Sequence, residues 1–212
     1  MKALKAIAKS IMPPQLVRQK LNRRGRGAAL LTFDDGPCPH ITPQVLDLLD
    51  RWNARGVFFV PGDRVPRAPN LLVEILKRGH RLGNHTYSHN VKSSFQGCVE
   101  EIERCQQTIF EVTGSRPDYF RPPQGKLTIP LLVAVMHCKL RTIRWTLDTG
   151  EYSYLRDASP EQLAKNLVTK VRERTIILSH DDAEQTPEML RIALPQLVER
   201  GFDLTIGVEC LG

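Results

Sequence analysis

The sequence predicts an α/β fold in the form of a distorted, incomplete (β/α) barrel of about seven parallel strands. From residue 28 onward, strand-like apolar runs alternate with helical patterns, and such alternation favours parallel strands joined by right-handed crossovers. The chain has 212 residues, and about 185 of them follow residue 27, fewer than the roughly 200 to 250 of a full eight-stranded barrel. The same alternation also permits a doubly wound open sheet, which we keep as the alternative.

The predicted strands are short and rich in apolar residues, and the first is a continuous apolar run that indicates a buried strand. A helix is expected to begin at Thr42 as the N-cap, with Pro43 at its first position, and to end at Gly56. The strand-like runs are residues 28–33, 57–60, 81–85, 119–121, 141–145, 175–179 and 203–206. The other helical patterns are residues 71–77, 99–112, 129–136, 160–171 and 187–200.

The composition is ordinary for a globular protein, with 41% hydrophobic and 25% charged residues. A formal net charge of +7 permits an anionic partner. We expect no nucleic acid, because the chain has neither a nucleic-acid motif nor an aromatic-rich basic stripe. Its five cysteines form no CxxC pair and no secretion signal is evident, which favours reduced thiols in a cytoplasmic protein.

The N-terminal residues 1–27 are expected to form a basic amphipathic segment and a linker ahead of one domain over residues 28–212. Over residues 1–12, apolar side chains recur at helical spacing with lysines between them. Such a helix can lie on the inner face of a membrane as a peripheral contact, or pack on the domain. Residues 22–27, NRRGRG, are typical of a flexible basic linker.

Polar residues collect where the predicted strands end, on the side of a barrel where active sites form. The spacing of His85 and His89 would place both imidazoles on one face of a helical turn. Two histidines and one carboxylate make a three-ligand metal set that leaves positions open for water and substrate. The strand-end residues are Asp34, Asp35, His85, His89, Arg121, Asp148, Glu151 and His180.

Five motifs in this order resemble carbohydrate esterase family 4, the NodB-type polysaccharide deacetylases, from residue 28 to about residue 206. The third motif has Gln124 where the family usually has an aromatic residue, and the fourth has Glu151 and Tyr152 where it usually has aspartate and tryptophan. The motifs are TFDDGP (32–37), HTYSH (85–89), RPPQG (121–125), DTGEY (148–152) and LSH (178–180).

The resemblance implies a role for each matching residue. The catalytic set would be Asp34 as general base, Arg121 as its orienting cation, His180 as general acid and Glu151 as the partner of His180. The substrate and oxyanion set would be the backbone N–H near Gln124, the walls Trp145 and Leu178, and Asp148 as a second possible partner of His180. The metal ligands would be Asp35, His85 and His89, with zinc as the default and cobalt, nickel or manganese also suited to them.

The expected function is therefore a metal-dependent N-deacetylase that hydrolyses the acetamide of an N-acetylated amino sugar, free, oligomeric or carrier-linked. Such hydrolysis needs activated water, a base and a proton for the leaving amine. Two alternatives stay open: a deformylase or amidase acting on a lipid-linked sugar or small amide, and a catalytically inactive sugar-binding relative. Asp181 and Asp182, directly after His180, could bind substrate, although two exposed acids after a strand are commonly only solvated.

Overall fold

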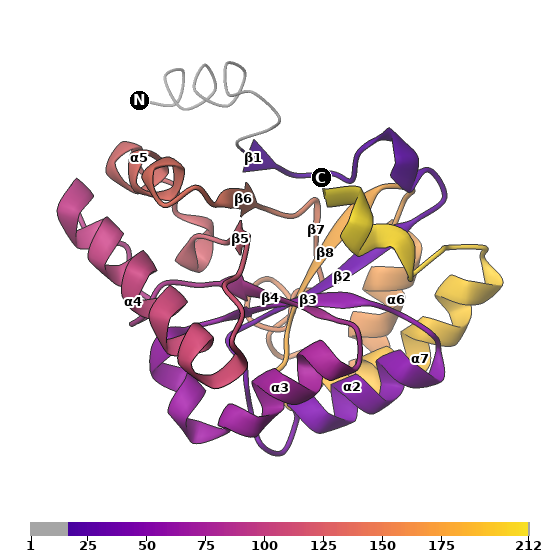
Figure 1. The fold of residues 1–212 in the computed structure, drawn as a ribbon. Coiled ribbons are helices and arrows are strands. Elements are labelled where there is room, and N and C mark those ends of the chain that lie inside the picture. Colours follow the sequence, from indigo (N-terminus) through magenta and orange to yellow (C-terminus); the bar gives the residue numbers. More distant parts are fainter. Residues whose placement is uncertain (1–16, 212) are drawn as a thin grey trace.

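The structure is a computed structural model that describes residues 17–211. Its centre is one curled sheet of eight strands in the order β1-β6-β5-β4-β3-β2-β8-β7, with parallel pairing between neighbours throughout the described residues (Figure 1). From β6 to β2 the strands follow one another in sequence order, as they do around a barrel, and the edges β1 and β7 leave the sheet open. The predicted incomplete barrel is confirmed, with eight strands in place of about seven.

Six of the predicted strands are present with similar bounds. Two further strands, β1 (Val17–Arg18) and β7 (Leu147–Asp148), were not predicted, because each has only two residues and neither lies within one of the strand-like apolar runs. The six are β2 (Ala29–Asp34), β3 (Gly56–Val60), β4 (Arg81–Asn84), β5 (Tyr119–Phe120), β6 (Arg141–Ile143) and β8 (Thr175–His180).

The predicted strand over residues 203–206 is wrong. Asp203 makes only an isolated bridge to Ala28, and its Oδ1 atom accepts hydrogen bonds from the backbone N–H groups of Thr205 (2.7 Å) and Ile206 (3.2 Å). An aspartate that binds nearby backbone amides favours a turn over an extended strand. The chain continues instead as the 3-10 helix η4 (Ile206–Leu211).

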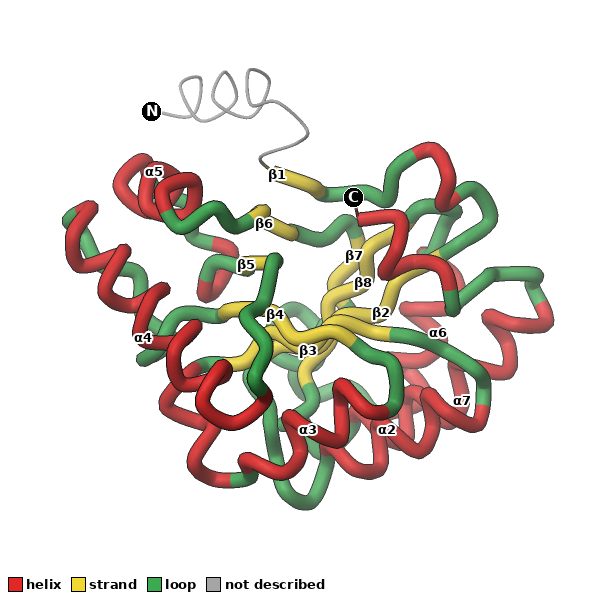
Figure 2. Tube along the Cα trace, viewed as in Figure 1, coloured by secondary structure: helices red, strands yellow, loops and turns green. Residues whose placement is uncertain are grey.

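Apolar side chains pack on both faces of the sheet because alternate residues of a strand point to opposite faces. On one face, Leu31 and Phe33 of β2 pack into the main cluster with residues of the surrounding helices; on the other, Leu30 packs with Phe59 and with Val208 of η4. Figures 1 and 2 show helices along one face of the sheet. The α-helices are α2 (Thr42–Arg51), α3 (Pro69–Lys77), α4 (Phe95–Thr113), α5 (Ile129–His137), α6 (Pro160–Lys170) and α7 (Thr186–Glu199). Among the described residues, no helix is both long and apolar enough to span a membrane.

The start of α2 differs from the prediction that Thr42 is its N-cap. The N-cap is Ile41, which makes no side-chain capping bond. The Thr42 hydroxyl instead donates a hydrogen bond of 2.6 Å to Oδ2 of Asp181, and it accepts one of 2.8 Å from the backbone N–H of Cys38. The Thr42 hydroxyl, which the sequence pattern predicts to cap the helix, therefore binds the buried carboxylate of Asp181 instead.

The predicted linker over residues 22–27 packs against the domain. The side chain of Asn22 caps a short 3-10 helix, η1 (Arg23–Gly25), by accepting a hydrogen bond of 2.9 Å from Arg24 N. The Asn22 N–H also donates to the carbonyl oxygen of Cys210 at 3.0 Å. Just before this stretch, β1 pairs with β6 and Leu21 is fully buried. The predicted amphipathic helix over residues 1–12 lies outside the described residues.

Candidate active site

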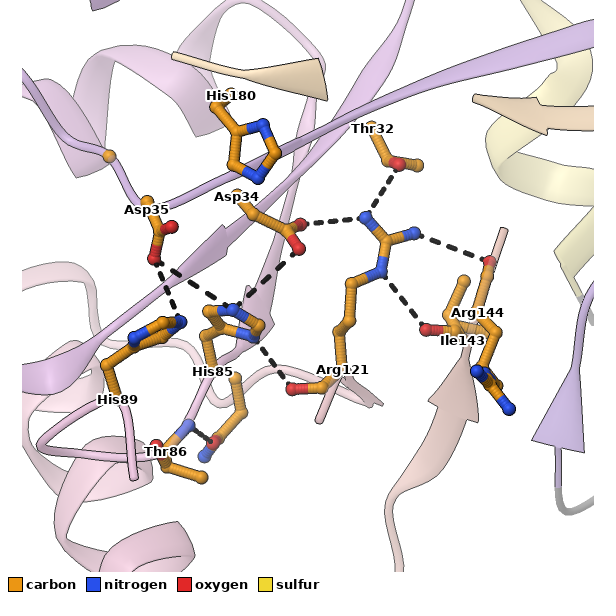
Figure 3. A network of polar contacts seen from close by, with 12 residues as sticks. Thr32, Asp34, Asp35, His85, Thr86, His89, Arg121, Ile143, Arg144 and His180 are labelled. Carbon is orange, nitrogen blue, oxygen red and sulfur yellow. Dashed lines mark hydrogen bonds and ion pairs between the residues drawn. The ribbon is translucent and has the colours of Figure 1, made fainter. Parts of the chain in front are cut away.

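The two adjacent acids at the end of β2 face the same site. Asp34 is the last residue of β2, paired in register with Phe59 of β3 and His180 of β8. Asp35 follows with a φ of 74°, a left-handed conformation that aspartate tolerates better than most residues. Successive side chains of an extended strand would point to opposite faces. With this turn, both carboxylates point toward the two imidazoles (Figure 3).

His85 and His89 come together through a loop, so the predicted helical turn is wrong. Residues 85–89 are not helical, and Thr86 and His89 have φ values of 64° and 55°. The Thr86 N–H donates a hydrogen bond of 2.9 Å to the Asn84 side chain, which fixes this loop. The two imidazole centroids lie 5.0 Å apart, so the loop achieves the proximity that helical spacing would have given.

The buried ring of His85 is prepared to act as a ligand. Its Nδ1 lies 2.7 Å from the carbonyl oxygen of Arg121, so Nδ1 carries the hydrogen and the lone pair of Nε2 faces the carboxylates. Burial lowers the pKa of His85 to about 3, which keeps the ring neutral. Its Nε2 lies 3.7 Å from Asp34 Oδ2 and 4.0 Å from Asp35 Oδ1 (Figure 3).

The set Asp35, His85 and His89 fits a divalent metal ion. One ligand atom from each residue can be chosen so that all lie within 4.8 Å of one another. Asp35 Oδ1 is buried and has no hydrogen-bond partner among the described residues, although His89 Nε2 is 3.3 Å away. A buried carboxylate oxygen without a donor is costly unless a cation meets it. One oxygen and two imidazole nitrogens are ligands that zinc accepts with an open position.

Arg121 holds Asp34 from inside the sheet. Its guanidinium is fully buried and lies 4.1 Å from the ring centroid of Phe59. Nη1 donates to Asp34 Oδ1 at 2.7 Å and to Thr32 Oγ1 at 2.8 Å, as Figure 3 shows. Burial raises the pKa of Asp34 above its usual range, and the charge of Arg121 opposes that rise. The bond fixes the carboxylate while leaving Oδ2 on the side of His85.

The second half of the site is the pair of His180 and Glu151. Glu151 Oε1 lies 3.1 Å from His180 Nδ1 and accepts hydrogen bonds of 2.8 Å from the His180 backbone N–H and from Ser179 Oγ. Burial disfavours charge on the His180 ring, but the hydrogen bond that the ring donates to Glu151 and the charges of Asp34 and Glu151 outweigh burial and raise the pKa of His180 to about 9. The ring is therefore positively charged at neutral pH.

Asp148 does not pair with His180. Its Oδ1 accepts a hydrogen bond of 2.8 Å from Gly150 N, and its Oδ2 accepts one of 3.1 Å from Ser153 Oγ. Of the two acids that the sequence left open as partners, the structure places Glu151 at the imidazole. The ring of Tyr152 lies against the ring of His180, with centroids 4.6 Å apart.

The three remaining predicted residues are Trp145, Gln124 and Leu178. Trp145 lies with its ring 5.5 Å from the Arg121 guanidinium. Gln124 is exposed, with a φ of 54°, in the 3-10 helix η3 (Pro123–Gly125). A Cβ atom on Gly125 would lie 2.9 Å from the Trp145 ring, so η3 packs on this tryptophan. Leu178 is buried within β8.

Sequence reasoning did not single out Arg64, and the expectation that the two acids after His180 are exposed and only solvated is wrong. Asp181 is buried, with 1% of its surface exposed. Asp182 Oδ2 lies 2.7 Å from Arg64 Nη1, and its Oδ1 accepts a hydrogen bond of 3.0 Å from Tyr152. Arg64 also donates to the carbonyl oxygen of Asp35. The position of two acids directly after a strand-end histidine was the available signal.

An incomplete barrel with this Asp/His/His cluster and these charged pairs at the ends of its strands is the architecture of NodB-type carbohydrate esterases. Residues 22–143 match the family described as polysaccharide deacetylase, and the chain belongs to that family. The resemblance stated from the motifs is thereby confirmed.

The similar proteins include enzymes named for peptidoglycan deacetylation. A peptidoglycan-N-acetylglucosamine deacetylase of Bacillus cereus is 34% identical over 189 residues, which cover 85% of this chain and 86% of that protein. The enzyme PgdA of Listeria monocytogenes is 32% identical over 205 residues, 96% of this chain but 42% of that protein, so the chain spans less than half its length. The structure of peptidoglycan deacetylase PdaC from Bacillus subtilis has a TM-score of 0.77 at 28% identity, covering 91% of this chain and 89% of that chain.

Proposed function

We propose that this protein is a metal-dependent N-deacetylase that hydrolyses the acetamide of an N-acetylated amino sugar. The observation that supports it best is the pairing of a candidate base and a candidate acid at the carboxyl ends of β2 and β8. Asp34, a carboxylate with a raised pKa, is in register with His180, an imidazole with a pKa of about 9. A base and an acid held side by side are what amide hydrolysis requires.

Asp35, His85 and His89 would hold the metal, and zinc is the ion that we propose. When bound, a divalent ion would lower the pKa of a water molecule and polarise the amide carbonyl. The remaining chemistry belongs to side chains of the protein. Asp34 Oδ2 accepts the proton of the attacking water, because Oδ1 is engaged by Arg121. A raised pKa suits a base that must take up a proton near neutral pH.

The proton for the leaving nitrogen comes from His180. Glu151 accepts the hydrogen of Nδ1 and so leaves the Nε2 proton free to be donated. Glu151 itself stays ionised: burial favours its neutral form, but the hydrogen bonds of His180 and Thr149 and the charge of His180 outweigh burial and hold its pKa below the usual range. The backbone N–H near Gln124, beside Trp145, is our proposed donor to the developing oxyanion.

An assay for acetate release from the zinc-loaded protein tests the proposal. The substrates should include N-acetylglucosamine oligomers, peptidoglycan fragments and lipid-linked amino sugars, because the relatives are named for peptidoglycan. Formate in place of acetate would favour the deformylase alternative. Stoichiometric zinc without release of either acid from any substrate would favour the inactive sugar-binding alternative.

We further propose a cytoplasmic protein that makes peripheral contact with the inner face of the membrane through residues 1–12. The alternation of lysines and apolar residues over this segment supports the proposal. A second support is the position of α5, whose exposed residues Ile129 (80%), Val133 (47%) and Met136 (48%) recur at helical spacing. β1, where the described chain begins, pairs with β6, the strand that follows α5.

A further inference from the structure

We propose that Asp181 is a positioning residue that holds the turn carrying Asp34 and Asp35 in register with His180. The inference rests on the proposed function, since the turn supplies the proposed base and one metal ligand. The side chain of Asp181 makes no hydrogen bond to the carboxylate of Asp34 or of Asp35 among the described residues. It acts through the backbone of residues 36–38 and through Thr42.

The hydrogen bonds of Asp181 and Thr42 fasten the turn on both sides of Pro37. Asp181 Oδ1 accepts a hydrogen bond of 3.1 Å from the Gly36 N–H. Asp181 Oδ2 accepts one of 2.6 Å from the Thr42 hydroxyl, which in turn accepts 2.8 Å from the Cys38 N–H. The backbone N–H of Asp181 also donates to the Asp34 carbonyl oxygen at 3.3 Å.

The shape of the site requires a residue without a side chain at position 36. A Cβ atom on Gly36 would lie 2.0 Å from Asp181 Oδ2 and 2.4 Å from its Cγ. The φ angle of Gly36 lies outside the left-handed region. Glycine is therefore required here because the Asp181 carboxylate approaches so closely, and not because of the backbone conformation. Glycine at this position is therefore explained by Asp181.

Burial of this carboxylate is unfavourable on its own. Burial raises the pKa of Asp181 to about 7, and the hydrogen bond from Thr42 opposes that rise. An acid this deeply buried is stable in the fold because its oxygens satisfy donors that would otherwise be unpaired. A purely apolar residue would leave the Gly36 N–H and the Thr42 hydroxyl without this acceptor.

The sequence position of Asp181 ties the two halves of the site together. Asp181 directly follows His180, so one short stretch carries the proposed acid and also holds the turn of the proposed base. Displacement of the turn would change the separation of acid, base and metal ligand at once. Misplacement of reacting groups by about 1 Å can lower the rate by roughly 10²-fold.

The test uses the full-length chain and measures zinc affinity by calorimetry, together with kcat and KM for acetate release. Asp181→Ala and Thr42→Val should each weaken zinc binding and lower kcat by about tenfold or more, with KM changed less than about threefold. Asp181→Asn should be milder, because its amide oxygen can still accept from Gly36 N–H. Thr142→Val is the matched control: Thr142 is fully buried, and its hydroxyl has no partner among the described residues. It should change none of the three quantities.

A double substitution tests the contact itself. Gly36→Ala should be severe in the native sequence, because the new methyl group meets the carboxylate. In the Asp181→Ala background the three nearest atoms are absent, so Gly36→Ala should add little further loss. Equal losses in the two backgrounds would contradict the proposed contact.

Wild-type zinc affinity and kcat in a folded Asp181→Ala protein would overturn the inference. If that variant does not fold, Thr42→Val, which removes one hydroxyl, decides the question by the same criteria. A wild-type protein that binds zinc but hydrolyses no acetamide would overturn the proposed function alone, and the zinc affinities of the variants would then decide the role of Asp181. A wild-type protein that binds no divalent metal would overturn both.

Discussion

Glu151 lies with Oε1 3.1 Å from Nδ1 of His180, and the same oxygen accepts the His180 backbone N–H at 2.8 Å. The glutamate is one methylene longer than the aspartate that the family motif usually has at this position. Its second oxygen accepts a hydrogen bond from Thr149, which holds the longer side chain in place. The pairing with the imidazole is kept despite the substitution.

Glu151→Gln should lower the pKa of His180 from about 9 toward the ordinary value of 6.5. The amide cannot supply the negative charge that favours the imidazolium, so the protonated form loses stability. NMR titration of the metal-free protein measures this pKa directly. The basic limb of the pH–rate profile should move to lower pH in the same variant. Asp148→Asn is the control, and a larger shift in that control would contradict the assignment of Glu151.

Asp34→Asn and Asp35→Asn should separate the roles of the two adjacent acids. Asp34→Asn leaves the ligand set intact, so the protein should keep its metal and lose activity by a factor on the order of 10² or more. Asp35→Asn should weaken metal binding, because a neutral amide oxygen is a poorer donor than a carboxylate. Metal content and kcat are the measurements. Loss of metal in the first variant with retention in the second would reverse the two roles.

Tyr152 covers His180 with its ring and bonds Asp182 with its hydroxyl. Tyr152→Phe keeps the ring and loses one hydrogen bond to a carboxylate, so kcat/KM should fall by a factor on the order of 10. Tyr152→Ala exposes the imidazole and should cost more. Tyr154→Phe removes a comparable exposed hydroxyl, bonded to the Asp148 carbonyl oxygen at 2.7 Å, and serves as the control. If kcat/KM falls equally in Tyr152→Phe and Tyr152→Ala, the hydroxyl of Tyr152 and not its ring is the part that matters.

The sequence predicted the strand ends well because each long strand combines an apolar run with a sharp polar stop. Asp34 and His180 lie at such stops, and the structure places them in register. Two kinds of feature could not be predicted this way. A two-residue strand outside an apolar run, such as β1, leaves no pattern in the sequence. Long-range side-chain contacts leave no local pattern either, so Thr42 was assigned to its helix although it binds an acid 139 residues away.

Deletion of residues 1–16 should release the protein from anionic vesicles without changing turnover on a soluble substrate. The deletion ends before β1, because Val17 and Arg18 pair with β6 and Leu21 is buried. Replacing Lys2, Lys5 and Lys9 with glutamine in the full chain should lower the partition coefficient by a factor on the order of 10², since each basic residue near an anionic surface contributes about 1 kcal/mol.

Cosedimentation with vesicles of phosphatidylglycerol and phosphatidylcholine, compared with phosphatidylcholine alone, measures the partition coefficient. Binding should fall as salt rises, because ions screen the attraction of lysines to the surface. Ile129→Ser tests whether α5 shares in the contact, and Val198→Ser, which removes a partly exposed apolar residue on α7, is its control. If the 212-residue chain does not bind anionic vesicles at low salt, the proposed membrane contact is wrong. If binding is unchanged after the deletion, the contact is made by the described domain and not by residues 1–12.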